Sequence, residues 1–199
     1  MPASLAAVAA DATTCTRCAL AGGRTNVVFG MGDPASDLMF IGEGPGAEED
    51  KQGLPFVGRS GQLLDRLMAE ELGLTRDRVY IANVVKCRPP NNRDPLPDEI
   101  AACRPYLEAQ LELIAPKVVV TLGKFAGQLL LASKEGITRL RGRSYPFATG
   151  VLVPTVHPAY VLRGGAEPMA QMRADLVRAK QALAAAGSPL VSTSSGTVR

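Results

Sequence analysis

The chain has 199 residues, of which 46% are hydrophobic and 21% charged; this composition fits one folded domain and excludes a mainly disordered protein. Lys and Arg total 22 against 19 Asp and Glu, and an excess of +3 permits a phosphate-binding face without demonstrating one. No apolar run reaches the roughly 18 to 20 residues of a membrane helix, which argues against a membrane-spanning protein.

The first ten residues, Met1 to Ala10, are small and mostly apolar, but no basic segment precedes them. We therefore expect a short helix here and not a secretion signal. A cytoplasmic protein is expected, and its four cysteines should then be reduced thiols that act as ligands or packing groups instead of disulfides.

Short apolar runs, most of them rich in β-branched residues, alternate with amphipathic stretches along the chain. Four runs predict strands: Leu38 to Ile41, Val79 to Val85, Lys117 to Leu122 and Val151 to Val156. Four stretches predict helices: Ser60 to Glu71, Pro97 to Ile114, Lys124 to Leu131 and Glu167 to Ala186. The alternation indicates βαβ units around a largely parallel sheet, and thus the α/β class.

The domain is predicted to cover residues 1–187. After Gly187 the sequence is small and polar with no amphipathic period, so residues 188–199 are predicted to form a flexible C-terminal tail. The segment from Arg88 to Pro97 is rich in proline, which lacks the N–H donor of a helix or strand. We expect it to be an ordered or semi-rigid loop.

Polar and glycine-rich segments follow the predicted strands, where α/β proteins bind ligands. The first run leads into Gly42-Glu43-Gly44-Pro45-Gly46, which could be a plain tight turn, a phosphate cradle or a close approach to a flat ligand. Asn83 lies near the end of the second run, and either caps loop backbone or binds a ligand. His157, the only histidine, follows the fourth run; a lone histidine is often a packed residue, but this position favours function.

The cysteines occur as Cys15-x2-Cys18 followed by Cys87 and Cys103. A two-residue spacing suits two ligands on one metal, and the spacing alone admits zinc, an iron–sulfur cluster or four unrelated buried thiols. A thioredoxin-like redox pair is disfavoured because the Cys15–Cys18 pair precedes the first predicted strand.

Three stretches are locally basic: Lys86 to Arg93, Arg139 to Arg143 and the neighbourhood of Arg163. Each could be ordinary solvated surface or part of a nucleic-acid-binding face.

Together these motifs resemble the family 4 uracil-DNA glycosylases, the iron–sulfur branch of the uracil-DNA glycosylase superfamily. The match extends from Cys15 to Arg163. It is carried by the four cysteines, Gly22-x-Arg24-Thr25, the 42–46 loop with Glu49-Asp50-Lys51, Pro55-Phe56-Val57-Gly58, the segment from Asn83 to Arg93, Leu122-Gly123, and His157-Pro158-Ala159-Tyr160.

The resemblance implies a three-layer α/β/α sandwich with a mostly parallel four-stranded sheet. It implies a monofunctional DNA-repair glycosylase that flips uracil out of single- or double-stranded DNA and hydrolyses its N-glycosidic bond. An abasic site would remain for base excision repair. The protein is expected to be monomeric, cytoplasmic and associated with a prokaryotic nucleoid. Cys15, Cys18, Cys87 and Cys103 would hold a [4Fe-4S] cluster.

The resemblance also assigns the uracil-binding residues. Phe56 would stack on the base, Asn83 would read its edge, and His157 would lie beside uracil O2. An amide can accept from uracil N3–H and donate to O4, whereas cytosine presents the opposite pattern. The implied set is Glu43, Gly44, Pro45, Phe56, Asn83 and His157.

The catalytic residues implied are Glu43, Glu49 and His157. Either glutamate could orient water or stabilise the cationic sugar, and Glu49 could instead crowd the methyl group of thymine. Gly44 stands where the best-known branch of the superfamily carries a water-positioning aspartate. Val161 stands where a leucine commonly forms the DNA wedge, so Val161 or Leu162 is expected to be the wedge.

Two alternatives remain. A related branch becomes covalently joined to DNA through a histidine in a basic loop, but no histidine occurs between Lys86 and Cys103. The other is a non-catalytic, zinc-bearing nucleic-acid-binding module, which would be colourless where an iron–sulfur protein is brown.

Overall fold

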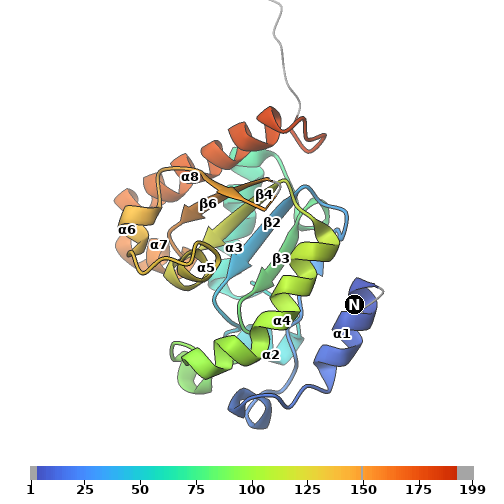
Figure 1. Cartoon of the computed structure of the whole chain (residues 1–199). Helices are drawn as coiled ribbons and strands as arrows, with labels where there is room; N and C mark the ends of the chain where they lie inside the picture. Colours follow the sequence, from blue (N-terminus) through green and yellow to red (C-terminus); the bar gives the residue numbers. More distant parts are fainter. Residues whose placement is uncertain (1–3, 149, 192–199) are drawn as a thin grey trace, which may run out of the picture.

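The computed structural model describes residues 4–148 and 150–191, and this part is built around one mixed sheet (Figure 1). Its centre is four parallel strands in the order β3 (Tyr80–Asn83), β2 (Leu38–Gly42), β4 (Val118–Leu122) and β6 (Gly150–Thr155). These are the four predicted strands. Two short antiparallel strands, β1 (Met31–Gly32) and β5 (Tyr145–Phe147), flank them within the described residues. At two and three residues, neither carries a readable alternation.

Side chains of the central strands alternate between two cores. In β2, Leu38 and Phe40 belong to one core cluster, and Met39 and Ile41 to the other. The first cluster is covered by α3 (Arg59–Leu67), α7 (Pro158–Gly164) and α8 (Ala166–Ala185). The second is covered by α1 (Leu5–Thr13), α4 (Pro97–Ile114) and α5 (Lys124–Leu130). The predicted three-layer α/β/α arrangement is confirmed.

The helices largely follow their predicted ranges. The stretch predicted from Ser60 to Glu71 is α-helical only through α3, and continues as a π-helical turn over Met68–Leu72. This turn ends at Gly73, whose φ of 70° suits glycine. Two short helices, α2 (Ala47–Gln52) and α6 (Ile137–Leu140), complete the set in the described part. The proline-rich segment is a loop with a single 3₁₀ turn over Pro90–Asn92.

The packed part of the chain extends beyond the predicted domain end at residue 187. Ser188 and Val191 are buried, and Val191 belongs to the core under α8. Residues 188–191 are thus packed against the domain, and the rest of the predicted tail, 192–199, lies outside the described residues. None of the helices in residues 4–148 and 150–191 has the length and apolarity to span a membrane.

The sheet order brings the chemistry-bearing loops together. Because β3, β2, β4 and β6 are parallel, their carboxyl ends lie at one edge of the sheet. The chain passes from β2 to β3 on one side of the sheet, and from β4 to β6 on the other side. The connections therefore run in opposite directions away from the neighbouring strands β2 and β4. Ligands of open α/β sheets bind at such a switch point.

Candidate functional site

A cleft of about 590 Å³ opens at this edge, within the range typical of small-molecule sites. All of the residues predicted to contact uracil line it, together with Glu49. They are Glu43, Gly44, Pro45, Glu49, Phe56, Asn83 and His157. Further lining residues that we did not predict are Gly46, Gly58, Arg59, Ser60, Pro89, Asn92, Arg93, Ala159 and Arg163.

Phe56 and His157 form an aromatic wall. Their ring centroids are 5.9 Å apart, with the planes inclined by 33°. Phe56 has a φ of 54°, a left-handed conformation that non-glycine residues rarely adopt. Arg76 holds this turn by donating to the carbonyl oxygens of Pro55 and Phe56. A strained backbone fixed in this way is common where a ligand must meet a preformed surface.

Two glycines allow the close packing around Phe56. A Cβ on Gly42 would lie 2.4 Å from Asn83 Oδ1 and 2.5 Å from the Phe56 ring. A Cβ on Gly61, in α3, would lie 1.6 Å from the Phe56 carbonyl oxygen. Any side chain at either position would therefore displace the aromatic ring or the amide.

Asn83 ends strand β3 and is only 1% exposed. Its Oδ1 has no hydrogen-bond partner within the described residues, although buried polar atoms are normally paired. The following backbone is fixed, because Val84 N donates to Gly42 O at 2.9 Å and Val85 N to Glu43 O at 3.0 Å. The amide is thus a rigidly held acceptor at the cleft wall.

His157 precedes the first turn of α7, and its Nδ1 accepts from the backbone N–H of Ala159 at 3.1 Å. A nitrogen that accepts cannot carry the proton, so the neutral ring has its proton on Nε2. Burial, and secondarily the charge of Arg163, lower the pKa of His157 to about 4, against an opposing effect of Glu49. At neutral pH the imidazole is therefore an uncharged donor through Nε2.

Glu43 follows β2 directly. Burial, and then the nearby carboxylate of Asp94, raise the pKa of Glu43 to about 7, while Lys124 opposes the rise. Lys124 and Asp94 themselves form an ion pair at 3.5 Å. Within the described residues the Glu43 carboxylate accepts no hydrogen bond and forms no ion pair, so its oxygens are free for a ligand or water.

Glu49 is engaged differently. Its Oε1 accepts from the backbone N–H of Val57 at 2.9 Å and of Gly58 at 2.8 Å, at the start of α3. A carboxylate is well placed at the positive end of a helix. Glu49 therefore ties α2 to the turn that carries Phe56, and this position favours an indirect role over the direct one that we expected.

The two predicted wedge residues on α7 have opposite surroundings. Val161 is 2% exposed and packs in the core, so its side chain cannot reach DNA, and that part of the prediction is wrong. Leu162 is 44% exposed. Ala159 and Arg163 line the cleft, and at about 100° per residue Val161 lies on the opposite side of the helix from both.

Two of the three basic stretches contribute an arginine to the cleft, and the third contributes an arginine to a buried ion pair. Arg93 lines the cleft and is held by the buried carboxylate of Glu99 at 2.6 and 2.8 Å. Arg163 lines the cleft as well. In the stretch from Arg139 to Arg143, the partly buried Arg141 pairs with the fully buried Asp175, so this arginine stabilises the fold and does not line the cleft.

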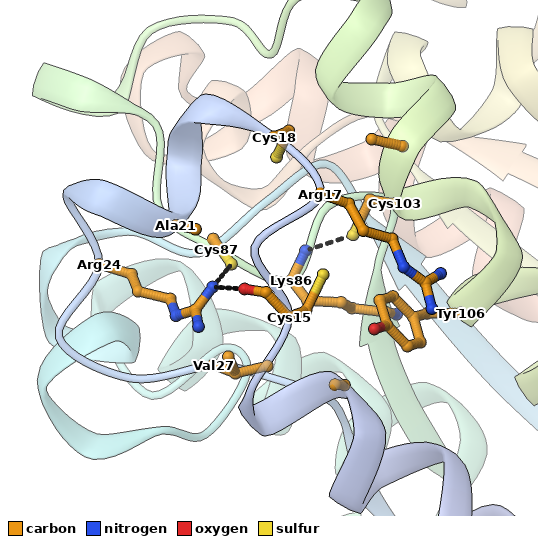
Figure 2. A pocket seen from close by; sticks show the side chains of 12 residues that line it. Cys15, Arg17, Cys18, Ala21, Arg24, Val27, Lys86, Cys87, Cys103 and Tyr106 are labelled. Atoms are coloured by element: carbon orange, nitrogen blue, oxygen red, sulfur yellow. Dashed lines mark hydrogen bonds between the residues drawn. The ribbon is translucent and has the colours of Figure 1, made fainter.

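The four cysteines line a second cavity, shown in Figure 2. The Arg24 guanidinium donates to the Sγ of Cys87 at 3.5 Å, and the backbone N–H of Lys86 donates to the Sγ of Cys103 at 3.2 Å. Burial raises the pKa of the Cys103 thiol to about 11 and also raises that of Cys87. In the part of the chain that the structure describes, no three His, Cys, Asp or Glu side chains are grouped so as to hold a single metal ion.

The chain matches the model of the uracil DNA glycosylase superfamily over residues 29–181. It is 48% identical over 168 residues to a type-4 uracil-DNA glycosylase of Sulfurisphaera tokodaii, covering 80% of this chain and 76% of that protein. It is 52% identical over 151 residues to a type-4 uracil-DNA glycosylase of Thermotoga maritima, covering 75% and 78%. A third relative with that name, from Saccharolobus solfataricus, is 47% identical over 163 residues, covering 78% and 76%.

Proposed function

The chain belongs to the uracil-DNA glycosylase superfamily and, within it, to the type-4 enzymes, and we propose that it removes uracil from DNA by hydrolysing the N-glycosidic bond. The observation that carries this proposal is the cleft itself. It combines an aromatic face, a neutral histidine and a buried amide whose oxygen has no hydrogen-bond partner among the described residues. The products are free uracil and an abasic site, the substrate of later steps in base excision repair.

Recognition rests on Phe56 and Asn83. A base in a duplex is out of reach, so the nucleotide must swing out of the stack into the cleft. There the Phe56 ring stacks on uracil, and the unpaired Asn83 Oδ1 accepts from N3–H while the amide nitrogen donates to O4. Cytosine would meet this amide with an acceptor opposite an acceptor, and a buried mismatch of this kind can lower reactivity by about 10⁴-fold.

Bond cleavage leaves negative charge on uracil and positive character on the sugar. His157 donates from Nε2 to O2 of the departing base, and its position does not depend on the substrate because Ala159 fixes the ring. A neutral donor stabilises the anion without giving up its proton. Uracil can thus leave as an anion.

Glu43 acts on the sugar side. Its free carboxylate, when ionised, orients the attacking water and stabilises the cationic sugar. Glu49 contributes by holding the Phe56 turn through the N–H groups of Val57 and Gly58. Gly44 and Pro45 complete the wall of the loop that meets the base.

Two further contacts hold the DNA. The exposed Leu162 enters the space that the flipped nucleotide leaves, since Val161 is confined to the core. Arg93 and Arg163, which both line the cleft, neutralise phosphates beside the uracil.

The four cysteines hold a [4Fe-4S] cluster in this proposal. The support is that all four cysteines line one cavity and that N–H groups donate to the sulfurs of Cys87 and Cys103. Hydrogen bonds to the ligating sulfurs are a common feature of iron–sulfur sites. The cluster supplies a structural link when bound, and the cleft residues carry out the hydrolysis.

We also propose that the enzyme acts as a monomer with one domain, on single- and double-stranded DNA, in the cytoplasm at the nucleoid. The support is that residues of one chain line the cleft, and that these include both proposed phosphate-binding arginines, Arg93 and Arg163.

The decisive experiment incubates the protein with single- and double-stranded oligonucleotides that carry one uracil, followed by alkaline cleavage of abasic sites. Matched oligonucleotides with thymine or cytosine are the controls. The proposal requires cleavage at uracil alone and no covalent adduct on a denaturing gel; an adduct would place the chain with the cross-linking branch. Binding without cleavage, by colourless protein, would favour the zinc module.

A further inference from the structure

Lys86 lies between the cleft and the cysteine cavity, and the hydrolysis described above does not use it. Its side chain is 1% exposed. The ammonium donates to the backbone carbonyl of Asn83 at 2.7 Å and to Gln110 Oε1 at 2.5 Å. The backbone N–H of the same residue donates to Cys103 Sγ, the contact drawn as a dashed line in Figure 2. One residue thus touches both sites.

A buried ammonium needs compensation, because burial of an unpaired charge is costly. Both hydrogen-bond acceptors of Lys86 are neutral oxygens, and no carboxylate pairs with it among the described residues. The four thiols line the same cavity as Lys86, and that of Cys103 accepts from its backbone N–H. The ring of Phe29, 5.8 Å from Nζ, adds a weaker attraction.

The bond from Lys86 to the Asn83 carbonyl acts on the residue that reads the base. Asn83 is the last residue of β3, and its carbonyl shares one peptide group with the Val84 N–H. The Val84 N–H donates to Gly42 O at 2.9 Å, so this peptide is held on its N–H side by the 42–46 loop and on its C=O side by Lys86. Rotation of this peptide would move the Asn83 side chain, and a misplacement of about 1 Å can cost 10²-fold in rate.

We propose that Lys86 is a positioning residue for uracil selection, which holds Asn83 in its base-reading geometry. This inference rests on the proposed function. It connects the second cavity with base selection through bonded atoms, because the backbone N–H of Lys86 donates to Cys103 Sγ and its ammonium donates to the Asn83 carbonyl.

The test is a double-mutant cycle with Lys86→Met, which keeps an unbranched side chain but removes the terminal amine and its charge, and Asn83→Ala. Gln110→Met is the matched control, since it removes the other acceptor of Lys86 and leaves the bond to Asn83. Three quantities are measured: iron per chain, single-turnover uracil release, and the equilibrium preference for a duplex with non-cleavable 2′-fluoro-deoxyuridine over the cytidine equivalent.

If Lys86 acts through Asn83, Lys86→Met should lower uracil release by about 10²-fold and abolish the binding preference, but change release by less than about threefold in the Asn83→Ala background. Gln110→Met should keep the preference. Equal losses in both backgrounds, or an unchanged preference, would overturn the inference. Should Lys86→Met not fold, Lys86→Arg, which keeps the charge but moves the donors, is subjected to the same cycle. Wild-type protein that releases no uracil would instead refute the proposed function.

Discussion

The pH dependence of uracil release tests the role of Glu43. The mechanism uses its ionised carboxylate, and burial with Asp94 raises its pKa to about 7. The ionised fraction then grows from about one tenth one unit below this pKa to about nine tenths one unit above, so the rate should rise about tenfold between about pH 6 and 8. His157 adds no slope in this window, because its pKa of about 4 keeps it neutral throughout.

The assay is single-turnover cleavage of a uracil oligonucleotide at subsaturating enzyme, because the second-order rate constant reports the pKa of the free enzyme. Two variants shift the midpoint in opposite directions. Asp94→Asn removes a neighbouring negative charge and should move it to lower pH, while Lys124→Met removes a positive charge and should move it to higher pH. Binding to an abasic-site duplex over the same pH range is the control for DNA affinity.

Glu43→Gln should be slower and should lose the rise between about pH 6 and 8. A wild-type profile that is flat, or a rise of the same size in Glu43→Gln, would refute the assignment. If Glu43→Gln shows a rise of the same size, another ionisable group orients the attacking water, and Glu43 only lines the cleft.

Other substitutions separate chemistry, flipping and stability. His157→Ala should lower single-turnover cleavage by about 10² to 10³-fold, with abasic-site binding retained, and equal losses in both would make it a docking residue. Leu162→Ala should slow cleavage of duplex DNA by about tenfold and leave single-stranded DNA unaffected, because only the duplex requires a wedge. Val161→Ala should instead lower the thermal midpoint; preserved stability with a duplex-specific defect would reverse the two assignments. Asp175→Ala should cost about 3 to 5 kcal/mol in urea unfolding, since it leaves Arg141 without its buried partner, and a loss below about 1 kcal/mol would contradict that pairing.

The main strands could be predicted because parallel strands that are buried on both faces appear as continuous apolar runs. Leu38 to Ile41 and Lys117 to Leu122 lie in the sheet interior, where both faces are covered, and each maps to its strand within one residue. The short strands β1 and β5 take their conformation from pairing with a neighbour. Such tertiary pairing leaves no local pattern.

The site also contains residues that the sequence predicts and residues that it does not. Asn83 and His157 could be found because parallel strands bring their last residues, and the residues just after them, to the same edge of the sheet. Arg93 and Arg163 carried a signal in their basic stretches, but whether such a stretch meets the cleft depends on the fold. The buried face of a seven-residue helix is ambiguous in sequence, so Val161 and Leu162 could not be separated.

The partners of polar side chains were the least predictable part. Glu49 accepts hydrogen bonds from backbone eight and nine residues away, and Lys86 reaches a residue 24 positions away. Lysine is normally exposed, so the sequence favours a surface position for Lys86. Only the packed structure shows that its ammonium is enclosed.

The short strands at the two borders of the sheet affect how crowded molecules meet. A long open border would offer a row of free N–H and C=O groups to a second molecule, the usual start of edge-to-edge aggregation. Here β1 offers two residues, and β5 three, with Pro146 in its middle and thus no N–H at that point. Molecules of this protein that gather along one stretch of DNA would have few unpaired backbone groups through which to associate. They could therefore pass or replace one another without aggregating.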